Sequence, residues 1–218
     1  MGIGGNNYYK NCYVDLKESC LRSETTVKVF DQMRKLQGFT DEGSPGRDWN
    51  VATGMVIEGK AGFQIMGDWA KGEFTAAGKV PGKDYYCAAT PSNNGYLYNV
   101  DSFIFYKSSD PDKQAGQKLL AKLMMGKNFQ KVFNLYKGSI PARLDVSMDE
   151  FDKCAKTSNA DIKTAGASGG LVPSFAHGMA QGNTMKAALQ DIITEHFNSD
   201  MSSVDAANAL ADSVLANM

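Results

Sequence analysis

Trp69 is the side chain whose type and position point most directly to ligand binding. It is one of two tryptophans, and Gly67 and Asp68 place it directly after an expected strand. A flat ring held at the end of a strand, where binding clefts often lie, can stack on the apolar C–H face of a sugar. The pattern fits a core tryptophan equally well, so both interpretations stand on pattern alone. Trp49 precedes a helical run and is expected to pack or to cap it.

Four polar side chains offer hydrogen bonds to a ligand with hydroxyl groups. Asn99 and Asp101 are two residues apart in an expected strand, so they point to the same face and suit paired hydrogen bonds to neighbouring hydroxyls. Lys137 ends an expected helix beside Gly138, where a solvated lysine that complements the helix dipole is the ordinary interpretation. His177 lies in a Gly/Ser-rich loop and is placed to project into a cleft, although a structural histidine is the commoner case.

Evidence for catalysis is weak. Residues 166–170, GASGG, match the string G-x-S-x-G of a hydrolase nucleophile, which requires a strand before it and a helix after it. Here a charged helical segment precedes the string and a loop follows, so a hydrolase that uses Ser168 and His177 is only a third alternative. His196 lies on a terminal helix beside Glu195 and is expected at the surface. We assign no catalytic residue and expect no cofactor.

The composition is that of a soluble globular protein with balanced charge. The chain has 218 residues, with 23 Lys+Arg against 24 Asp+Glu, a formal net charge of -1 and 43% hydrophobic residues. No block of basic residues marks a surface for nucleic acid or for an anionic membrane. No apolar run approaches the ~18 residues of a membrane span. Near neutrality suits an uncharged ligand bound by stacking and hydrogen bonds.

Four cysteines, Cys12, Cys20, Cys87 and Cys154, allow two disulfides in an oxidising compartment, with three possible pairings. Four buried thiols in a reducing compartment are an equal alternative. Without a C-x-x-C motif, and with only two histidines, the ligand spacing of a zinc site is absent. The opening residues lack the basic and apolar regions of a secretory signal, so an exported parent would carry its signal outside this chain.

Helical patterns outnumber strand patterns along the chain. Apolar spacing, caps and glycine stops predict helices over residues 24–37, 50–58, 111–125 and 127–137, and two terminal helices capped by Thr184 and Ser203. Apolar, aromatic and β-branched residues predict strands over residues 61–66 and 98–106, and residues 164–182 are expected to form a loop. These strands are too few to complete the sheet of a mixed α/β domain. We therefore expect part of the fold to lie outside this chain.

Five segments carry a resemblance to a known family. They are VKVFDQMRKLQGF, GRDWNVATGMVIEGKAGFQIMGDWAKGEF, YNVDSF, FNLYKGSIPARLD and LVPSFAHGMA, and the likeness covers essentially the whole chain. The run ending in GDWAKGEF and the segment YNVDSF are the most specific. In these segments the chain resembles the family-1 extracellular solute-binding proteins of ABC sugar transporters, and within them the glucose/mannose-binding type.

The resemblance implies an α/β fold, a periplasmic-binding-protein-like clamshell of type II that holds a sugar between two lobes. Members of the family are roughly twice as long as this chain, which corresponds to their C-terminal half. By the resemblance, residues 1–90 and 145–218 form the C-terminal lobe. Residues 91–144 form a hinge strand and helices that would complete the N-terminal lobe.

The same resemblance assigns roles to the ambiguous residues. It implies that Trp69 stacks on the sugar and that four polar residues bond its hydroxyls, namely Asn99, Asp101, Lys137 and His177. It also implies a disulfide between Cys87 and Cys154, whereas Cys12 and Cys20 form a local bridge or stay free.

The function implied is that of the substrate-binding component of an ABC sugar importer. It would bind a monosaccharide such as glucose without catalysis, and the full-length parent would be periplasmic or at the cell surface and would dock on the membrane permease. The alternative is a truncated module that assembles with a complementary N-terminal half, or with itself, and does not bind sugar tightly alone.

Overall fold

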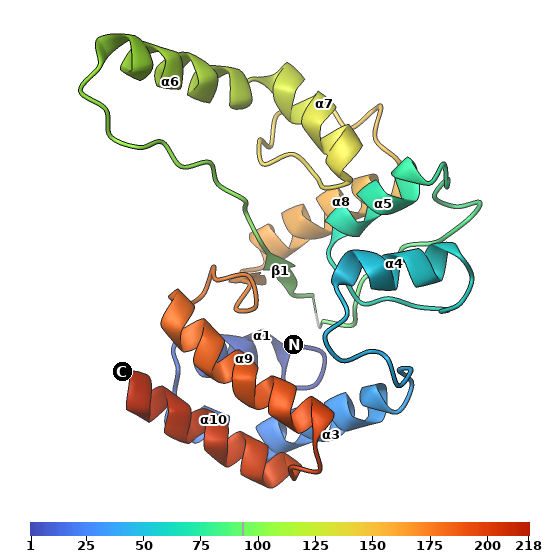
Figure 1. Ribbon diagram of the computed structural model, residues 1–218, viewed down its shortest axis with the longest axis vertical. Helices are drawn as coiled ribbons and strands as arrows, with labels where there is room; N and C mark the ends of the chain where they lie inside the picture. The colour runs from blue at the N-terminus through green and yellow to red at the C-terminus, as the bar shows by residue number, and fades with distance from the viewer. Residues whose placement is uncertain (93) are drawn as a thin grey trace. The chain divides into compact units, whose positions relative to one another are not determined.

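The computed structural model describes residues 1–92 and 94–218, and its contacts divide the chain into two units. Unit 1 comprises Met1–Arg47, Thr90–Asn99 and Ile162–Met218, and unit 2 comprises Asp48–Ala89 and Val100–Asp161. Each unit is described by itself below. Both are rich in helices, and the described residues contain one small sheet (Figure 1). The division into lobes inferred for the complete protein stays a prediction.

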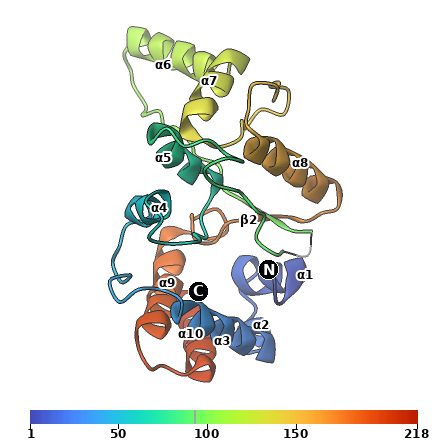
Figure 2. The ribbon, with the colours of Figure 1, turned by 90° about the vertical axis from the view of Figure 1, so that its right-hand side faces the viewer.

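Helices form most of unit 1. They are α1 (Gly5–Tyr9), the π-helical turn η1 (Lys10–Val14), α2 (Glu18–Leu21), α3 (Glu24–Gln37), α9 (Asn183–Asn198) and α10 (Ser203–Asn217). Helices α3, α9 and α10 pack side by side in both views (Figure 1 and Figure 2). Their apolar faces bury Phe30, Leu189, Leu210 and Val214, and Leu21 of α2 joins the same core. This core is the local consequence of apolar residues that recur every three or four positions.

Capping residues mark the helix starts in unit 1. The Ser23 side chain accepts a hydrogen bond from the Thr26 amide and begins α3. The cap of α10 is Ser202 rather than the predicted Ser203, and its hydroxyl accepts from the Asp205 amide at 3.1 Å. Thr184 is not a cap either, because α9 begins one residue earlier, after Gly182.

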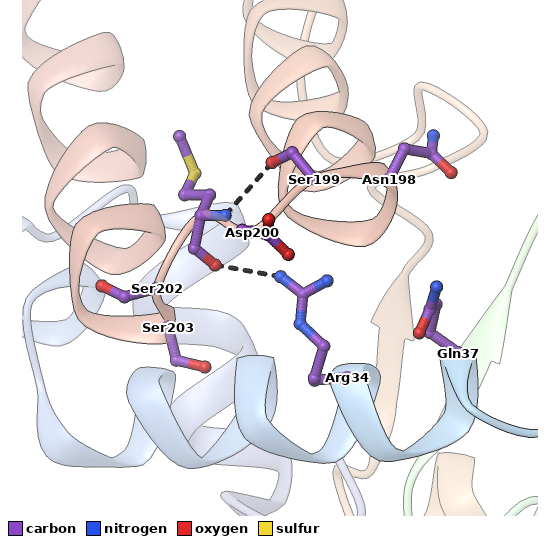
Figure 3. A pocket seen from close by; sticks show the side chains of 8 residues that line it. Arg34, Gln37, Asn198, Ser199, Asp200, Ser202 and Ser203 are labelled. Atoms are coloured by element: carbon purple, nitrogen blue, oxygen red, sulfur yellow. Dashed lines mark hydrogen bonds between the residues drawn. The ribbon is translucent and has the colours of Figure 1, made fainter.

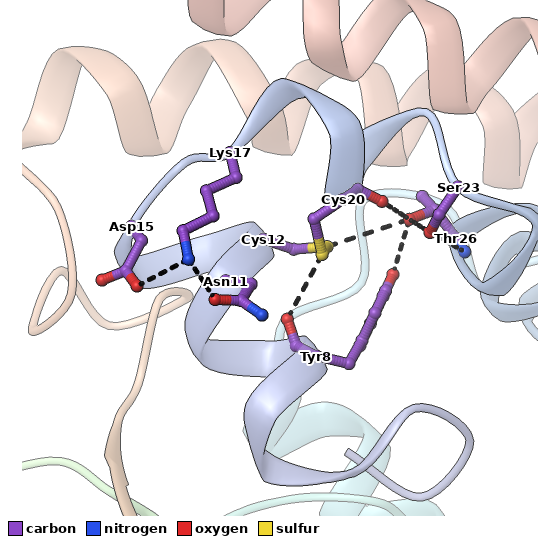
Figure 4. The surroundings of a disulfide bond; sticks show 8 residues. All are labelled: Tyr8, Asn11, Cys12, Asp15, Lys17, Cys20, Ser23 and Thr26. Atoms are coloured by element: carbon purple, nitrogen blue, oxygen red, sulfur yellow. Dashed lines mark hydrogen bonds and ion pairs between the residues drawn. A yellow bond between two sulfur atoms is a disulfide. The ribbon is translucent and has the colours of Figure 1, made fainter.

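A disulfide joins Cys12 to Cys20 and links η1 to α2 (Figure 4). Cys12 is fully buried, and Thr26 of α3 lies beside it. The Thr26 hydroxyl donates to the Cys20 carbonyl at 2.8 Å, so the Tyr8 hydroxyl is the donor in its 2.9 Å bond to Thr26. The bridge and this hydrogen-bond chain tie the first helical turns to α3.

The sheet consists of two parallel strands, β1 (Tyr96–Tyr98) and β2 (Leu171–Pro173), with Tyr96 opposite Leu171. Tyr9 supports the end of β2, because its hydroxyl donates to the Pro173 carbonyl at 3.1 Å and accepts from the Phe175 amide at 2.8 Å. The sheet therefore rests on α1 through one side chain.

Unit 2 contains α4 (Trp49–Ile57), the short 3-10 turn η2 (Asp68–Ala70), α5 (Lys71–Ala76), α6 (Pro111–Met124) and α7 (Lys127–Lys137). Helix α8 (Lys153–Ala167) begins in unit 2 and ends in unit 1. A disulfide between Cys87 and Cys154 ties the loop after α5 to the start of α8. A small core forms around Val146, Phe151 and Ala155.

The prediction of strands over residues 61–66 and 98–106 is wrong. β1 ends at Tyr98, and both segments are otherwise irregular and exposed, with Phe63 95% and Ile104 78% accessible. A strand needs a neighbour to accept its backbone hydrogen bonds, and β-propensity measures fit to such a neighbour. Where the described residues supply no adjacent strand, the pattern alone does not produce one.

The predicted loop over residues 164–182 is partly wrong as well. Helix α8 continues to Ala167, and β2 lies inside the segment. The predicted helices over residues 24–37, 50–58, 111–125 and 127–137 are confirmed to within a residue or so, because periodicity and caps are local signals.

Candidate functional site

The turn that carries Trp69 is shaped by two glycines. Gly67 precedes η2, and the indole ring folds back over it, so a Cβ at position 67 would overlap the ring. A Cβ on Gly72, at the start of α5, would lie 2.9 Å from the Lys137 carbonyl oxygen. Trp69 is half-buried in this turn. The ring position therefore depends on the absence of a side chain at Gly67, and the close approach of α5 to the end of α7 depends on its absence at Gly72.

The end of α7 packs directly against this turn. Gly138 follows Lys137 with a φ of 91°, in the left-handed region that ends helices. A Cβ at Gly138 would lie 2.7 Å from the Gly72 nitrogen and 3.1 Å from the Asp68 carbonyl oxygen. The two backbones thus approach more closely than side chains would allow. The turn of Trp69 and the end of α7 form one framework within unit 2.

The Asp68 carboxylate reinforces this framework. Its Oδ2 accepts a hydrogen bond from the Ile140 amide at 3.2 Å. Burial raises the pKa of Asp68, and the Ile140 hydrogen bond and the nearby Lys71 charge oppose that rise. Lys71 is itself buried and pairs with Asp152 at 2.7 Å. The Asp68 side chain therefore links the turn of Trp69 to the segment that follows α7.

Two residues predicted to bind a ligand meet in unit 2. The Lys137 ammonium forms an ion pair with the Asp101 carboxylate. The Lys137 nitrogen also lies 5.7 Å from the centroid of the Phe133 ring. A donor and an acceptor of opposite charge are thereby placed at the end of α7, near the turn of Trp69.

His177 and Asn99 belong to unit 1. His177 is exposed on the turn after β2, and its Nδ1 lies 2.7 Å from the Ser174 hydroxyl oxygen. Asn99 is half-buried and follows β1 by one residue. The expectation that Asn99 and Asp101 share a strand face is wrong, because the strand ends at Tyr98 and the two residues fall in different units.

His196 is not at the surface, contrary to the prediction. Its side chain is fully buried, and its ring centroid lies 4.7 Å from that of Phe30. Burial lowers the pKa of His196, and the positive charge of Arg34 lowers it further. The burial of His196 results from the tertiary packing of α9 on α3. The charged neighbour Glu195, on which the surface prediction rested, does not indicate it.

The G-x-S-x-G string lies in the wrong structural setting for a nucleophile. Ser168 directly follows α8, and its hydroxyl donates to the Thr164 carbonyl at 3.1 Å. Helix precedes the serine where a nucleophile elbow has a strand. The side-chain hydroxyl paired with His177 is that of Ser174.

Two pockets differ in their relation to the predicted ligand-binding residues: one contains none of them, and the other includes Lys137. A polar pocket of about 510 Å³ in unit 1 contains none of the predicted ligand-binding residues (Figure 3). In it Arg34 donates to the Met201 carbonyl at 2.9 Å and so joins α3 to the turn before α10. An apolar pocket of about 540 Å³ lies on α7 and is lined by Phe129, Val132, Phe133, Tyr136 and Lys137.

The described residues contain neither a cluster of metal ligands nor a helix fit to span a membrane. Within residues 1–92 and 94–218, no three His, Cys, Asp or Glu side chains cluster as metal ligands would. Over the same ranges, no helix combines the length and apolar character needed to cross a bilayer.

A family of known binding proteins matches most of the chain. The model described as "Bacterial extracellular solute-binding protein" matches residues 8–164. The chain belongs to this family. This is a family of binding proteins rather than of enzymes, and the helix-rich structure with a small sheet is consistent with a periplasmic-binding-protein-like domain.

The chain is also similar to proteins named for sugar binding. It is 45% identical over 211 residues to a "Probable sugar-binding periplasmic protein" of Brucella suis, which covers 96% of this chain and 50% of that protein. A protein of the same name from Rhizobium meliloti is 42% identical over 96% of this chain and 51% of its own length. A xylose/arabinose-binding protein of Haloferax volcanii is 29% identical over 76% of this chain and 36% of its own length. The chain spans about half the length of the Brucella and Rhizobium relatives.

Sequence reasoning missed the residues that hold the predicted side chains in place. The sequence predicts that Gly67 and Asp68 place Trp69 at the end of a strand, but it gives no signal for the close approach of Gly72 to Gly138. Ser174 had a usable signal, because it lies three residues before His177 in a loop.

Proposed function

We propose that this chain is the C-terminal half of the substrate-binding protein of an ABC sugar importer, and that the full-length protein binds a monosaccharide such as glucose. The observation that carries the proposal is the framework of unit 2. There a half-buried Trp69 and the Lys137–Asp101 ion pair are attached to two backbone segments in direct contact. The names of the Brucella and Rhizobium relatives support a sugar as the ligand.

Binding is capture without chemistry. Trp69 covers an apolar face of the pyranose, Asp101 accepts from sugar hydroxyls and Lys137 donates to them. Asn99 and His177 add polar contacts. Hydrogen bonds that involve the two charged groups contribute ~1.5 to 3 kcal/mol each. Analogues that lack a hydroxyl are rejected, because the polar groups of the site would then stay unpaired.

The proposed location of the full-length protein is the periplasm or the cell surface, from which it delivers sugar to the membrane permease. The two disulfides support an oxidising compartment. The relatives named periplasmic agree with that location.

The test is calorimetric titration of the full-length parent with glucose and related monosaccharides. Trp69→Ala and Asp101→Ala are each expected to abolish micromolar binding, because one removes the stacking surface and the other a charged acceptor. Trp49→Ala removes the other tryptophan, on α4, and is the control expected to bind as the unmodified protein does. Unchanged titrations in the Trp69 and Asp101 variants would contradict the assignment of the site.

A second candidate function is favoured by exposed apolar side chains. Helix α6 buries none of its residues, and Leu119 and Leu123 on it are exposed. We propose as the alternative that the chain assembles with a complementary N-terminal half or with a second copy through such surfaces. Light scattering of the isolated chain tests self-association. A monomer that unfolds cooperatively and neither self-associates nor binds the separate N-terminal half would contradict this alternative.

A further inference from the structure

We propose that Ser174 fixes the tautomer of His177, so that its Nε2 carries the proton and donates a hydrogen bond to a sugar oxygen. The sugar in this statement rests on the proposed function. The tautomer itself rests on the contacts of Ser174 alone.

Ser174 is anchored through its backbone on both sides of the turn. Its amide donates to the Tyr98 carbonyl at 2.9 Å and continues the pairing of β2 with β1. Its carbonyl accepts from the Met179 amide at 2.9 Å and from the Ala180 amide at 3.3 Å. The turn that contains His177 therefore closes on Ser174, which is 7% exposed.

The residues that flank Ser174 are held as well. The Tyr9 hydroxyl bonds the Pro173 carbonyl at 3.1 Å and the Phe175 amide at 2.8 Å. Because both neighbouring residues are hydrogen-bonded to Tyr9 of α1, the backbone position from which the Ser174 side chain projects is fixed. From there its hydroxyl oxygen reaches Nδ1 of His177 at 2.7 Å.

The direction of this hydrogen bond follows from the serine. In the described part of the chain, the Ser174 hydroxyl makes one hydrogen bond, the one to His177. If Nδ1–H were the donor, the serine proton would be left without an acceptor in a buried position, which is costly. The serine therefore donates to the Nδ1 lone pair, and the proton of the neutral ring resides on Nε2.

This assignment gives His177 a specific role in recognition. An Nε2–H group selects a ligand oxygen that accepts, either a hydroxyl oxygen or the ring oxygen of a pyranose. Asp101, as a carboxylate, selects a hydroxyl that donates. Ser174 is a positioning residue in this scheme, since it acts through the imidazole and not on the ligand.

The experiment is ¹⁵N NMR of the histidine rings in the full-length protein above pH 7.5, combined with calorimetry. The unmodified protein is expected to show His177 protonated on Nε2. Ser174→Ala should shift the ring towards a mixture of tautomers and weaken glucose binding about 2- to 12-fold, the range that one net hydrogen bond supports. Ser174→Thr keeps the hydroxyl and should keep the Nε2–H tautomer. Ser168→Ala, on the neighbouring exposed turn, is the control and should change neither measurement.

Three results would overturn the proposal. The first is a His177 ring protonated on Nδ1 in the unmodified protein, a result that does not depend on whether any variant folds. The second is Ser174→Ala with an unchanged tautomer and unchanged affinity. The third is an unmodified protein that shows Nε2–H but binds no monosaccharide, which refutes the donor role together with the proposed function and leaves the tautomer standing.

Discussion

Lys71 carries its charge into the interior of unit 2, where Asp152 is its counter-ion. The ammonium nitrogen lies 2.7 Å from the carboxylate, and the lysine side chain is 7% exposed while that of Asp152 is 35% exposed. Asp152 has a second task, because its other oxygen accepts from the Ala155 amide at 2.9 Å at the start of α8. One carboxylate thus joins α5 to α8 beside the turn that carries Trp69. Removing its charge would leave the lysine uncompensated.

The ion pair gives a prediction about stability and pH. Burial raises the pKa of Asp152, but the hydrogen bonds from Lys71 and from the Ala155 amide outweigh it, and the pKa lies below the ordinary 3.8. Because the pKa of Asp152 is lower in the folded than in the unfolded protein, its ionised carboxylate stabilises the folded state fully above pH 3.8. This stabilisation is lost as the pH falls through the pKa of Asp152 in the folded protein. Asp152→Asn keeps the amide cap and removes the charge, so it should cost about 2 to 3 kcal/mol at pH 7.

Urea unfolding at pH 7 and at pH 3 measures this difference. The free energies of unfolding of the unmodified protein and of Asp152→Asn should differ less at pH 3 than at pH 7. Asp41→Asn is the matched control, since Asp41 pairs with Arg47 at the surface and should show a smaller loss. An equal difference in free energy of unfolding at both pH values would show that the charge of Asp152 is not its cause.

At the scale of elements, η2, the start of α5 and the end of α7 function as a single support. The backbones of α5 and α7 meet at Gly72 and Gly138, and the ring of Trp69 covers Gly67. Nothing in the spacing of these residues predicts that they meet, since they lie about seventy positions apart. The contact is a property of the packed unit, and it explains why Trp69 and Lys137 lie on adjacent segments.

Gly67→Ala is the substitution that isolates this support. The new methyl group would overlap the indole ring and displace it, so the full-length protein should bind glucose at least about 10-fold more weakly. Gly62→Ala is the control, because nothing lies within 4 Å of its added Cβ. Calorimetry measures the affinity, and tryptophan fluorescence reports the altered surroundings of Trp69. Equal affinities in the two variants would show that the ring position does not matter for binding.

The helices were predictable and the strands were not, for one physical reason. Ser23 and the apolar residues of α3 specify a helix through contacts within a few residues. Residues 61–66 and most of 98–106 have the composition of strands, yet a strand requires a partner that the same stretch does not contain. His196 illustrates the same limit at one side chain, because its burial depends on α3, more than 150 positions away. Trp69, Asp101 and Lys137 were named from the sequence, whereas the contacts that hold them were visible only in the structure.

At the scale of the whole molecule, the exposed apolar residues of unit 2 are the feature that the chain itself does not explain. Phe63, Phe103 and Ile104 are each more than half exposed, in segments with the composition of strands. The chain spans about half the length of the Brucella and Rhizobium relatives, and we propose that further residues of a full-length parent cover these segments. Coverage would supply both the missing strand neighbours and a large gain in buried apolar surface.

Ile104→Ser distinguishes a side chain that is simply exposed from one that the parent protein buries. In the isolated chain Ile104 is 78% exposed, so its free energy of unfolding should change by less than about 0.5 kcal/mol. In the full-length parent the same substitution should cost about 1.5 to 3 kcal/mol, because burial of an isoleucine contributes that much. Val204→Ser, at an exposed position of α10, is the matched control and should be neutral in both proteins. Urea unfolding of the four variant proteins measures the comparison, and a neutral Ile104→Ser in the parent would show that residues 100–106 stay uncovered there.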